Sequence, residues 1–153
     1  MPGILTRDFG LLEMDSSSEL RFSLGLPGFP EETSFVLIEQ EATAPLVFLQ
    51  STFSTKLCFL AIPVHHIDPD YQIGMNSDDL RAIGFDGSPQ PSIKTEVLCL
   101  VLLTAQPDGA LTANLLAPVV MNLATRGSVQ AVRTDSRYSH QQPVGTPETA
   151  PCL

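Results

Sequence analysis

Short apolar runs, each ended by turn-forming residues, constrain the fold of this chain more than any other feature of its sequence. Each run is long enough for one β-strand and too short for a helix that is buried on all sides. Turn signals end the runs, as at Pro63 and between Gln106 and Gly109. The clearest runs occupy residues 35–38, 46–49, 57–62, 96–103, 118–121 and 129–132. Strands and turns this closely spaced predict an all-β barrel or sandwich rather than alternating strands and helices.

Two shorter stretches predict hairpins. Residues 4–5 and 9–14 would form one around the sequence Asp8-Phe9-Gly10. Residues 125–128 would make a hairpin-like connection between the last two apolar runs.

One short helix is predicted, over about residues 77–83. Asn76 or Ser77 provides an N-cap, and the aspartates that follow complement the positive end of the helix dipole. Gly84 fits the position just after the helix, where a left-handed backbone ends it. A helix of about two turns needs packing against the sheet to be stable.

Together these signals predict a mainly-β chain that forms a small single-domain β-barrel-like fold with one short helix. A length of 153 residues suits one compact domain with a sizeable core. We expect the ordered domain to span residues 1–141. Residues 142–153 contain three prolines among small polar residues, and this composition predicts a disordered tail.

The charge balance is acidic, with 17 Asp and Glu residues against 8 Lys and Arg residues and a net charge of −9. Such a surface repels a phosphate backbone, so direct nucleic-acid binding is not expected. A basic protein partner would be attracted, although the same charge also serves solubility.

The sequence predicts a cytoplasmic protein without a membrane partner. The longest apolar run, residues 97–103, is far shorter than the roughly 20 residues of a membrane span. The chain starts without the basic stretch and apolar core of a signal peptide. Three cysteines without a CxxC spacing indicate a reducing compartment.

A metal site could be built from His65, His66, Asp68 and Asp70, which lie close together in the sequence. Adjacent histidines on a strand point to opposite faces, however, so this pair would chelate one ion poorly. The simpler interpretation is a polar loop after the strand that ends at Pro63. We therefore predict neither a metal nor a cofactor.

Asp135, Ser136 and His140 contain the residue types of a hydrolase triad. Triad members usually come from separate segments of a scaffold, and six consecutive residues place a base poorly between nucleophile and acid. The G-x-S-x-G pattern of many hydrolases is also absent from the sequence. We therefore predict no catalytic residue, and interpret this segment as a terminal strand or loop with solvated side chains.

A series of motifs between about residues 3 and 140 resembles a known family. The longest is LTANLLAPVVMN at residues 111–122, and it is completed by Arg126-Gly127 and by SRYS at residues 136–139. The others are GLPGF at residues 25–29, FLQS at 48–51 and DPDY at 68–71. In their order and spacing these motifs resemble the FliW family of flagellar assembly factors.

The resemblance implies a β-barrel-like binding protein without catalytic activity. Members of the family bind the carbon storage regulator CsrA, a small basic RNA-binding dimer that represses flagellin translation, and they also bind flagellin. Free flagellin would occupy the factor, and secretion of flagellin would release the factor to sequester the regulator. Such a switch depends on linked or competing binding equilibria.

Two other functions remain open from the residues alone. A small hydrolase could use His65, His66 or His140 with nearby acids. A β-barrel with an apolar interior could instead bind a small ligand, because the many Leu, Val and Phe residues suit such a cavity equally well.

We expect the partner surface to include Asp68, Asp70 and Tyr71, because loops on a rigid scaffold often carry binding residues. The two acids can pair with Lys or Arg of a basic partner, and the tyrosine ring can act as an amphipathic anchor. The alternative is that Asp68 is a local cap and that Tyr71 packs on the sheet. Asn114 and Tyr138 are the other candidate contacts, although an Asn among apolar residues usually bonds neighbouring backbone groups.

Overall fold

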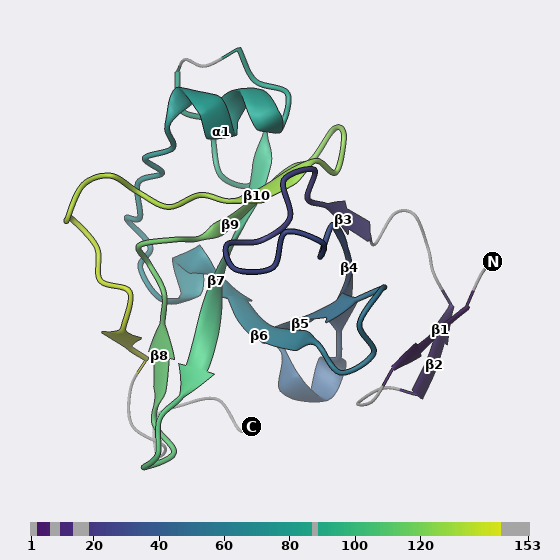
Figure 1. The fold of residues 1–153 in the computed structure, drawn as a ribbon. Helices are drawn as coiled ribbons and strands as arrows, with labels where there is room; N and C mark the ends of the chain where they lie inside the picture. The colour runs from purple at the N-terminus through teal and green to yellow at the C-terminus, as the bar shows by residue number, and fades with distance from the viewer. Residues whose placement is uncertain (1–2, 7–9, 14–18, 87–88, 145–153) are drawn as a thin grey trace.

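The protein is described by a computed structural model that covers residues 3–6, 10–13, 19–86 and 89–144. Within these residues it is mainly β-strand, with one α-helix and two short 3₁₀-helices (Figure 1). In chain order the elements are β1 (Gly3–Thr6), β2 (Gly10–Glu13), β3 (Glu19–Arg21), β4 (Ser34–Glu39), η2 (Glu41–Thr43), β5 (Val47–Ser51), β6 (Cys58–Pro63), η3 (Val64–His66), α1 (Ser77–Ala82), β7 (Val97–Ala105), β8 (Leu111–Ala113), β9 (Val119–Asn122), β10 (Ser128–Gln130) and β11 (Gln142–Pro143).

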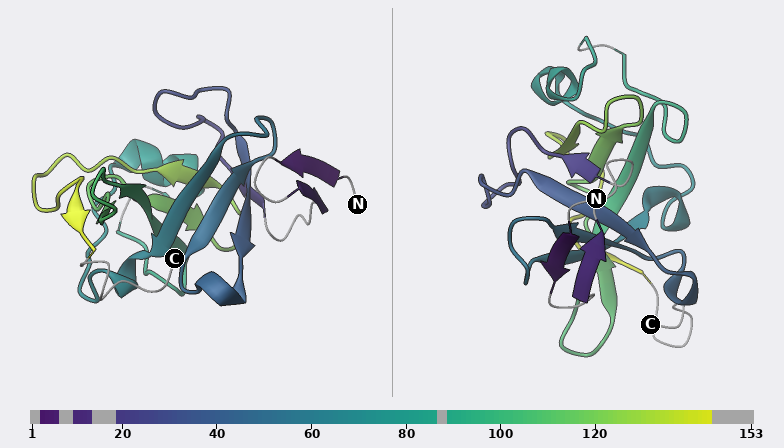
Figure 2. Two further views of the ribbon diagram at one scale, coloured as in Figure 1. Left: turned by 90° about the horizontal axis from the view of Figure 1, so that it is seen from below. Right: turned by 90° about the vertical axis from the view of Figure 1, so that its right-hand side faces the viewer.

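Nine of these strands form one curved antiparallel sheet. Hydrogen-bonded neighbours follow the order β10-β9-β7-β6-β5-β4-β3, and β8 with β11 extends from the far end of β7. Strands β1 and β2 pair only with each other, and their hairpin lies beside the β4 side of the main sheet (Figures 1 and 2).

The two edges of the main sheet approach each other without closing into a full barrel. A single parallel bridge joins Arg21 to Gly127, and the Arg21 N–H donates to the carbonyl of Arg126 over 3.1 Å. The side chain of Arg126 donates in return from Nε to the carbonyl of Glu19 over 2.8 Å. The mainly-β, barrel-like prediction is therefore confirmed, with the β9–β10 turn fastening an open sheet.

The inner face of the curved sheet holds one of two core clusters. Leu37, Leu49 and Phe59 oppose one another across β4, β5 and β6, so their side chains share this face. Phe22 and Phe35 meet edge to face beside them, with ring centroids 5.5 Å apart. The interior is thus filled by the protein's own side chains.

The second core cluster lies on the outer face of β7, β9 and β10, where α1, η3 and the loop after η3 cover the sheet (Figure 1). Val101 and Val120 contribute from the strands, and Leu80 and Ile83 contribute from the helix side. The packing of this second cluster holds the loop after η3 against the sheet.

The predicted helix is confirmed as α1, one residue shorter than expected. The side chain of Asn76 caps it by accepting the Asp79 N–H at 2.8 Å. Gly84 follows with a φ of +95°, which ends the helix as the sequence indicated. The amide of Asn122 then donates to the carbonyl of Ile83 over 2.7 Å and ties the helix end to β9. Among the described residues, no helix has the length and apolar character needed to span a bilayer.

The six predicted runs all contain strands, with ends shifted by a few residues. The last run, for example, forms β10 at Ser128–Gln130 instead of residues 129–132. Strands β3, β8 and β11 were not predicted, because two or three residues give no recognisable apolar run. The predicted amino-terminal hairpin forms, while the turn residues 7–9 lie outside the described residues.

The expected boundary at residue 141 is wrong by at least three residues. Strand β11 pairs with β8, so Gln142 and Pro143 belong to the sheet. Val144 donates its N–H to the carbonyl of Leu111 over 3.1 Å and packs on the outer core cluster. Proline is tolerated here because β11 is an edge strand that needs few donors. The rest of the predicted disordered tail, residues 145–153, lies outside the described residues.

Two truncations test this boundary. We expect removal of residues 145–153 to change the free energy of unfolding by less than about 0.5 kcal/mol, as for surface changes in general. Removal of residues 142–153 should lower it by about 1–2 kcal/mol, because the contacts of β11 and a partly buried valine are lost. Urea unfolding followed by far-ultraviolet circular dichroism measures both. Equal effects of the two truncations would contradict the role assigned to β11.

Candidate functional site

Two segments that are distant in sequence meet outside the sheet and bring the predicted contact residues together. The first is the loop of residues 68–72, which follows η3. The second is residues 133–138, which follow β10. Where they meet, the rings of Tyr71 and Tyr138 lie with centroids 4.4 Å apart and planes inclined by 39°. We call these two segments and their contact the tyrosine site.

The 68–72 loop has a local reason for its shape. The Oδ1 atom of Asp68 accepts the N–H of Asp70 at 2.9 Å, and the Tyr71 N–H donates to the carbonyl of Asp68 over 3.1 Å. Pro69 between them fixes its own φ and favours the turn. Asp68 is thus a local cap, which leaves it half-buried, while Asp70 is exposed.

Tyr71 is buried with only 4% of its surface exposed, so the expectation of an exposed anchor is wrong for this ring. The turn aims the ring back at the outer core cluster, where its hydroxyl donates to the carbonyl of Leu115 over 2.7 Å. An aromatic ring gains more by completing this apolar layer than by facing water. Burial disfavours the charged phenolate and raises the pKa of Tyr71 to about 12.

Arg133 joins the two segments from below the tyrosine rings. Its guanidinium carbon lies 5.7 Å from the ring centre of Tyr71 and 4.8 Å from that of Tyr138. Nε and Nη2 each donate over 2.9 Å to the two carboxylate oxygens of Asp135, and Nη1 donates to the carbonyl of Gln72. This paired hydrogen bond lowers the pKa of Asp135 and raises that of Arg133.

Tyr138 is half-buried and lies at the edge of the site toward solvent. Its hydroxyl accepts the N–H of Gln72 at 3.1 Å. The guanidinium carbon of Arg137 lies 5.7 Å from the ring centre of Tyr138, and its Nη1 donates to Oε1 of Gln72 over 2.6 Å. The exposed rim therefore carries charges of both signs, from Asp70, Asp135 and Arg137.

Asn114 supports the site from behind. Its Oδ1 atom accepts the N–H of Ala117 at 3.1 Å, which is the local backbone role that an Asn among apolar residues usually has. The next residue, Leu115, accepts from the Tyr71 hydroxyl and donates its N–H to the carbonyl of Ser139 over 2.9 Å. The motif that contains Asn114 thus shapes the turn on which both segments of the tyrosine site rest.

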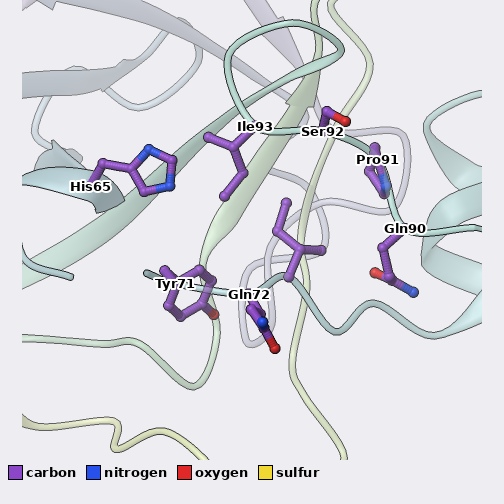
Figure 3. A pocket seen from close by; sticks show the side chains of 8 residues that line it. His65, Tyr71, Gln72, Gln90, Pro91, Ser92 and Ile93 are labelled. Atoms are coloured by element: carbon purple, nitrogen blue, oxygen red, sulfur yellow. The ribbon is translucent and has the colours of Figure 1, made fainter. Parts of the chain in front are cut away.

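An open cleft of about 530 Å³ borders the tyrosine site (Figure 3). In this view His65 and Tyr71 lie on one side of it, while Gln90 and Pro91 lie on the other. The Gln90 side chain accepts the N–H of Met75 at 2.8 Å and donates to its carbonyl over 3.0 Å, as a neighbouring strand would. The cleft is lined by polar side chains such as Gln72 and Ser92 and by the apolar side chains of Ile73 and Ile93, a mixture that is typical of binding clefts.

The geometry gives no support to the alternative chemistries. Among the described residues, no group of three or more His, Cys, Asp or Glu side chains could hold a metal ion. Of the triad candidates, Asp135 is engaged by Arg133 rather than by His140. The interior of the sheet, where a small ligand would bind, is packed with the inner core cluster.

Sequence reasoning missed Arg133 and Gln72, which join the two segments of the tyrosine site. Arg133 follows an apolar run, and nothing in that run signals that its side chain is buried. Its pairing with Asp135, two residues later, was the one local hint of a structural role. Gln72 acts mainly through its backbone, so its contacts depend on the fold alone.

Comparison with known proteins relates this arrangement to one family. The family model described as FliW protein matches residues 3–144. A flagellar assembly factor FliW from Geobacillus sp. (strain WCH70) is 33% identical over 135 residues, which are 88% of this chain and 90% of that protein. This chain belongs to the FliW family. The FliW match includes β11 and ends at Val144.

Other FliW proteins give the same result. The flagellar assembly factor FliW of Bacillus subtilis (strain 168) is 29% identical over 142 residues, covering 93% of this chain and 96% of that protein. A crystal structure of the flagellar assembly factor FliW superposes with a TM-score of 0.81 at 30% identity. It covers 96% of this chain and 99% of that one, so the FliW fold is shared over its whole length.

Removal of one hydroxyl tests how far Tyr71 stabilises the site. We expect Tyr71→Phe to lower the free energy of unfolding by about 1–3 kcal/mol, because the Leu115 carbonyl loses its donor inside the core. Tyr138→Phe, the matched control at the solvent edge, should cost less than about 1 kcal/mol because water can replace the hydroxyl. Urea unfolding of both variants measures this. A larger loss for Tyr138→Phe would reverse the roles assigned to the two rings.

The raised pKa of Tyr71 predicts a loss of stability at high pH. The chain has two tyrosines, so the Tyr138→Phe variant leaves Tyr71 as its single phenol. Its tyrosinate absorbance should then rise with a midpoint near pH 12 rather than near 10.0, the ordinary pKa of tyrosine. The unfolded chain releases the Tyr71 proton at a lower pH than the folded chain does. The stabilisation by the protonated Tyr71 hydroxyl is therefore fully present below pH 10 and is lost between pH 10 and pH 12. A folded-state midpoint near 10 would contradict the burial of this hydroxyl.

Proposed function

We propose that this protein is a cytoplasmic, non-catalytic flagellar assembly factor that binds the translational regulator CsrA and flagellin. The observation that carries the proposal is the FliW match over residues 3–144, which includes nearly every described residue. The FliW relatives are named flagellar assembly factors, and the partners are those that the resemblance of the motifs implies.

Charge supports a basic protein as one of the two partners. The net charge of −9 attracts a basic RNA-binding dimer and repels RNA itself. The protein would therefore act on the regulator directly, without competing for nucleic acid through a basic surface of its own. Complementary charge of this kind raises the association rate and specificity more than it raises affinity.

We propose the rim of the tyrosine site as the regulator-binding surface. Asp70 is exposed, and the half-buried Asp68 and Tyr138 flank it on the two segments. A rim of charges around a half-buried aromatic ring is the usual anatomy of a protein contact. Tyr71 and Asn114 contribute by holding the two segments in place, since the ring of Tyr71 is buried and Asn114 bonds its own turn.

The two partners would make the protein a switch. Flagellin that accumulates in the cell would occupy the factor, leaving the regulator free to repress flagellin translation. Secretion of flagellin would return the factor to the regulator. Such a switch works over the range of partner concentrations in which one partner changes the apparent affinity of the protein for the other.

A competition experiment tests this function. Purified protein is immobilised, and the cognate CsrA dimer and flagellin monomer are passed over it separately and together. We expect each to bind alone and flagellin to reduce the amount of CsrA retained. A catalytic or metal-dependent protein, or one loaded with a small apolar ligand, would retain neither partner. That outcome would refute the proposed function.

Neutralising the loop acids tests the proposed surface. We expect Asp68→Asn with Asp70→Asn to slow CsrA association and to flatten its dependence on salt, because rim charges act mainly through steering. Asparagine at position 68 can still accept the N–H of residue 70, so the turn should persist. Surface-binding kinetics at two salt concentrations measure both effects.

A matched control removes the same charge elsewhere. Glu39→Gln with Asp108→Asn also neutralises two exposed acids, and Asp108 likewise accepts a nearby N–H, from Ala110 at 3.0 Å. This control should change the association rate less than the loop variant does. If the two double variants slow association equally, only the total charge matters and the 68–72 loop is not the interface.

A further inference from the structure

Arg133 is buried and hydrogen-bonded to neighbouring residues, although it belongs to the proposed binding site. Its side chain is 4% exposed, and each of its three nitrogens donates a hydrogen bond to Asp135 or Gln72. Its guanidinium also faces both tyrosine rings. A residue buried in this way cannot reach a partner, so any effect on binding must pass through the groups it holds.

We propose that Arg133 is a positioning residue that holds the 68–72 loop and the 133–138 segment as one rigid surface, and that the partner recognises this fixed arrangement. The claim about the partner rests on the proposed function, whereas the claim that Arg133 holds the two segments together does not. Arg133 donates to the backbone of Gln72 on one segment and to Asp135 on the other. Its removal would leave the two segments joined by the tyrosine contact, by the bond from the Gln72 N–H to the Tyr138 hydroxyl and by the exposed Gln72–Arg137 bond.

The shape of the guanidinium, and not only its charge, carries this role. A planar fork can engage both oxygens of one carboxylate and stack against aromatic rings, whereas a lysine ammonium is a compact point charge. An apolar residue of similar volume could fill the same space, since buried ion pairs often add little stability over apolar packing. The advantage of arginine here is therefore a defined geometry between two segments.

Gly74 provides independent support for a close fit around Arg133. A Cβ atom added at Gly74 would lie 2.6 Å from Nη2 and 2.8 Å from Cζ of Arg133, closer than atoms can approach. The backbone just after the 68–72 loop therefore packs directly on the guanidinium, and glycine at position 74 permits this approach.

The partner-free test compares amide hydrogen exchange in the wild type and in Arg133→Lys and Arg133→Leu. We expect the Gln72 N–H, which bonds the Tyr138 hydroxyl, to exchange at least about tenfold faster in both variants, as for a local opening. Amides of the central strand β7 should keep their protection, because the sheet is untouched. Arg81→Leu, which removes an exposed arginine on α1, is the matched control and should change neither group.

Tyrosine emission gives a second readout that is specific to this site. The chain has no Trp and two Tyr residues, and both tyrosines lie here. We expect Arg133→Leu and Asp135→Asn to change the emission and to increase its quenching by acrylamide. Asp135→Asn serves as the milder variant, because Asp135 is 52% exposed and its loss should leave the fold intact.

A double-mutant cycle separates positioning from general destabilisation. Gly74→Ala should speed exchange of the Gln72 N–H in the wild type by forcing the guanidinium away. In the Arg133→Leu background the same change should have no further effect, because the colliding atoms are gone. Additive effects of the two substitutions, or unchanged exchange in Arg133→Leu, would overturn the inference.

Partner binding completes the test. We expect Arg133→Lys and Asp135→Asn to weaken CsrA binding at least about fivefold through faster dissociation, with the melting temperature within a few degrees of the wild type. If a variant whose Gln72 amide exchanges faster still binds CsrA with the rates of the wild type, the claim that the partner recognises this arrangement is overturned. If the wild type itself binds neither CsrA nor flagellin, the proposed function fails, and the exchange, emission and cycle measurements still decide the positioning role.

Discussion

Burial of β7 on both of its faces is the constraint on which the rest of the structure depends. Its first seven residues alternate between the two core clusters, with Val97, Cys99, Val101 and Leu103 in the outer one and Leu98, Leu100 and Leu102 in the inner one. A strand buried on both faces must be apolar at every position, which explains the uninterrupted run in the sequence. It also requires a second layer, and that layer is supplied by α1, η3 and the loop after η3.

The tyrosine site is a consequence of this second layer. Covering β7 draws Tyr71 into the outer cluster, and the hydroxyl then needs a partner because water cannot reach it. The Leu115 carbonyl provides that partner, and Arg133 fills the remaining polar space between the loop and the segment after β10. The rim that faces solvent is therefore built on groups whose contacts are all satisfied, which keeps it in one arrangement before any partner arrives.

The tyrosine site presents fixed charges rather than groups ready to transfer a proton. Its arginine and its carboxylate are engaged with each other, and the pKa shifts of both favour their charged forms. A general acid or base needs a pKa near the working pH and access to a substrate, and Arg133 has neither. Fixed charges around a half-buried ring are instead what a protein partner can read through shape and electrostatic complementarity.

The sequence by itself determined where the longer strands form, where the one helix begins and ends, and that the chain is acidic, because these follow from local pattern and composition. Its motifs also determined the family. Tertiary structure alone decided that Tyr71 is buried, that Arg133 lies beneath it, and that residues 142–144 complete the sheet. Those outcomes depend on contacts between residues that are far apart in the sequence, such as Arg133 with Gln72. No local pattern encodes a contact across such a sequence separation. The free energy that selects them comes from packing the second layer on β7, and this packing exists only once the sheet has formed.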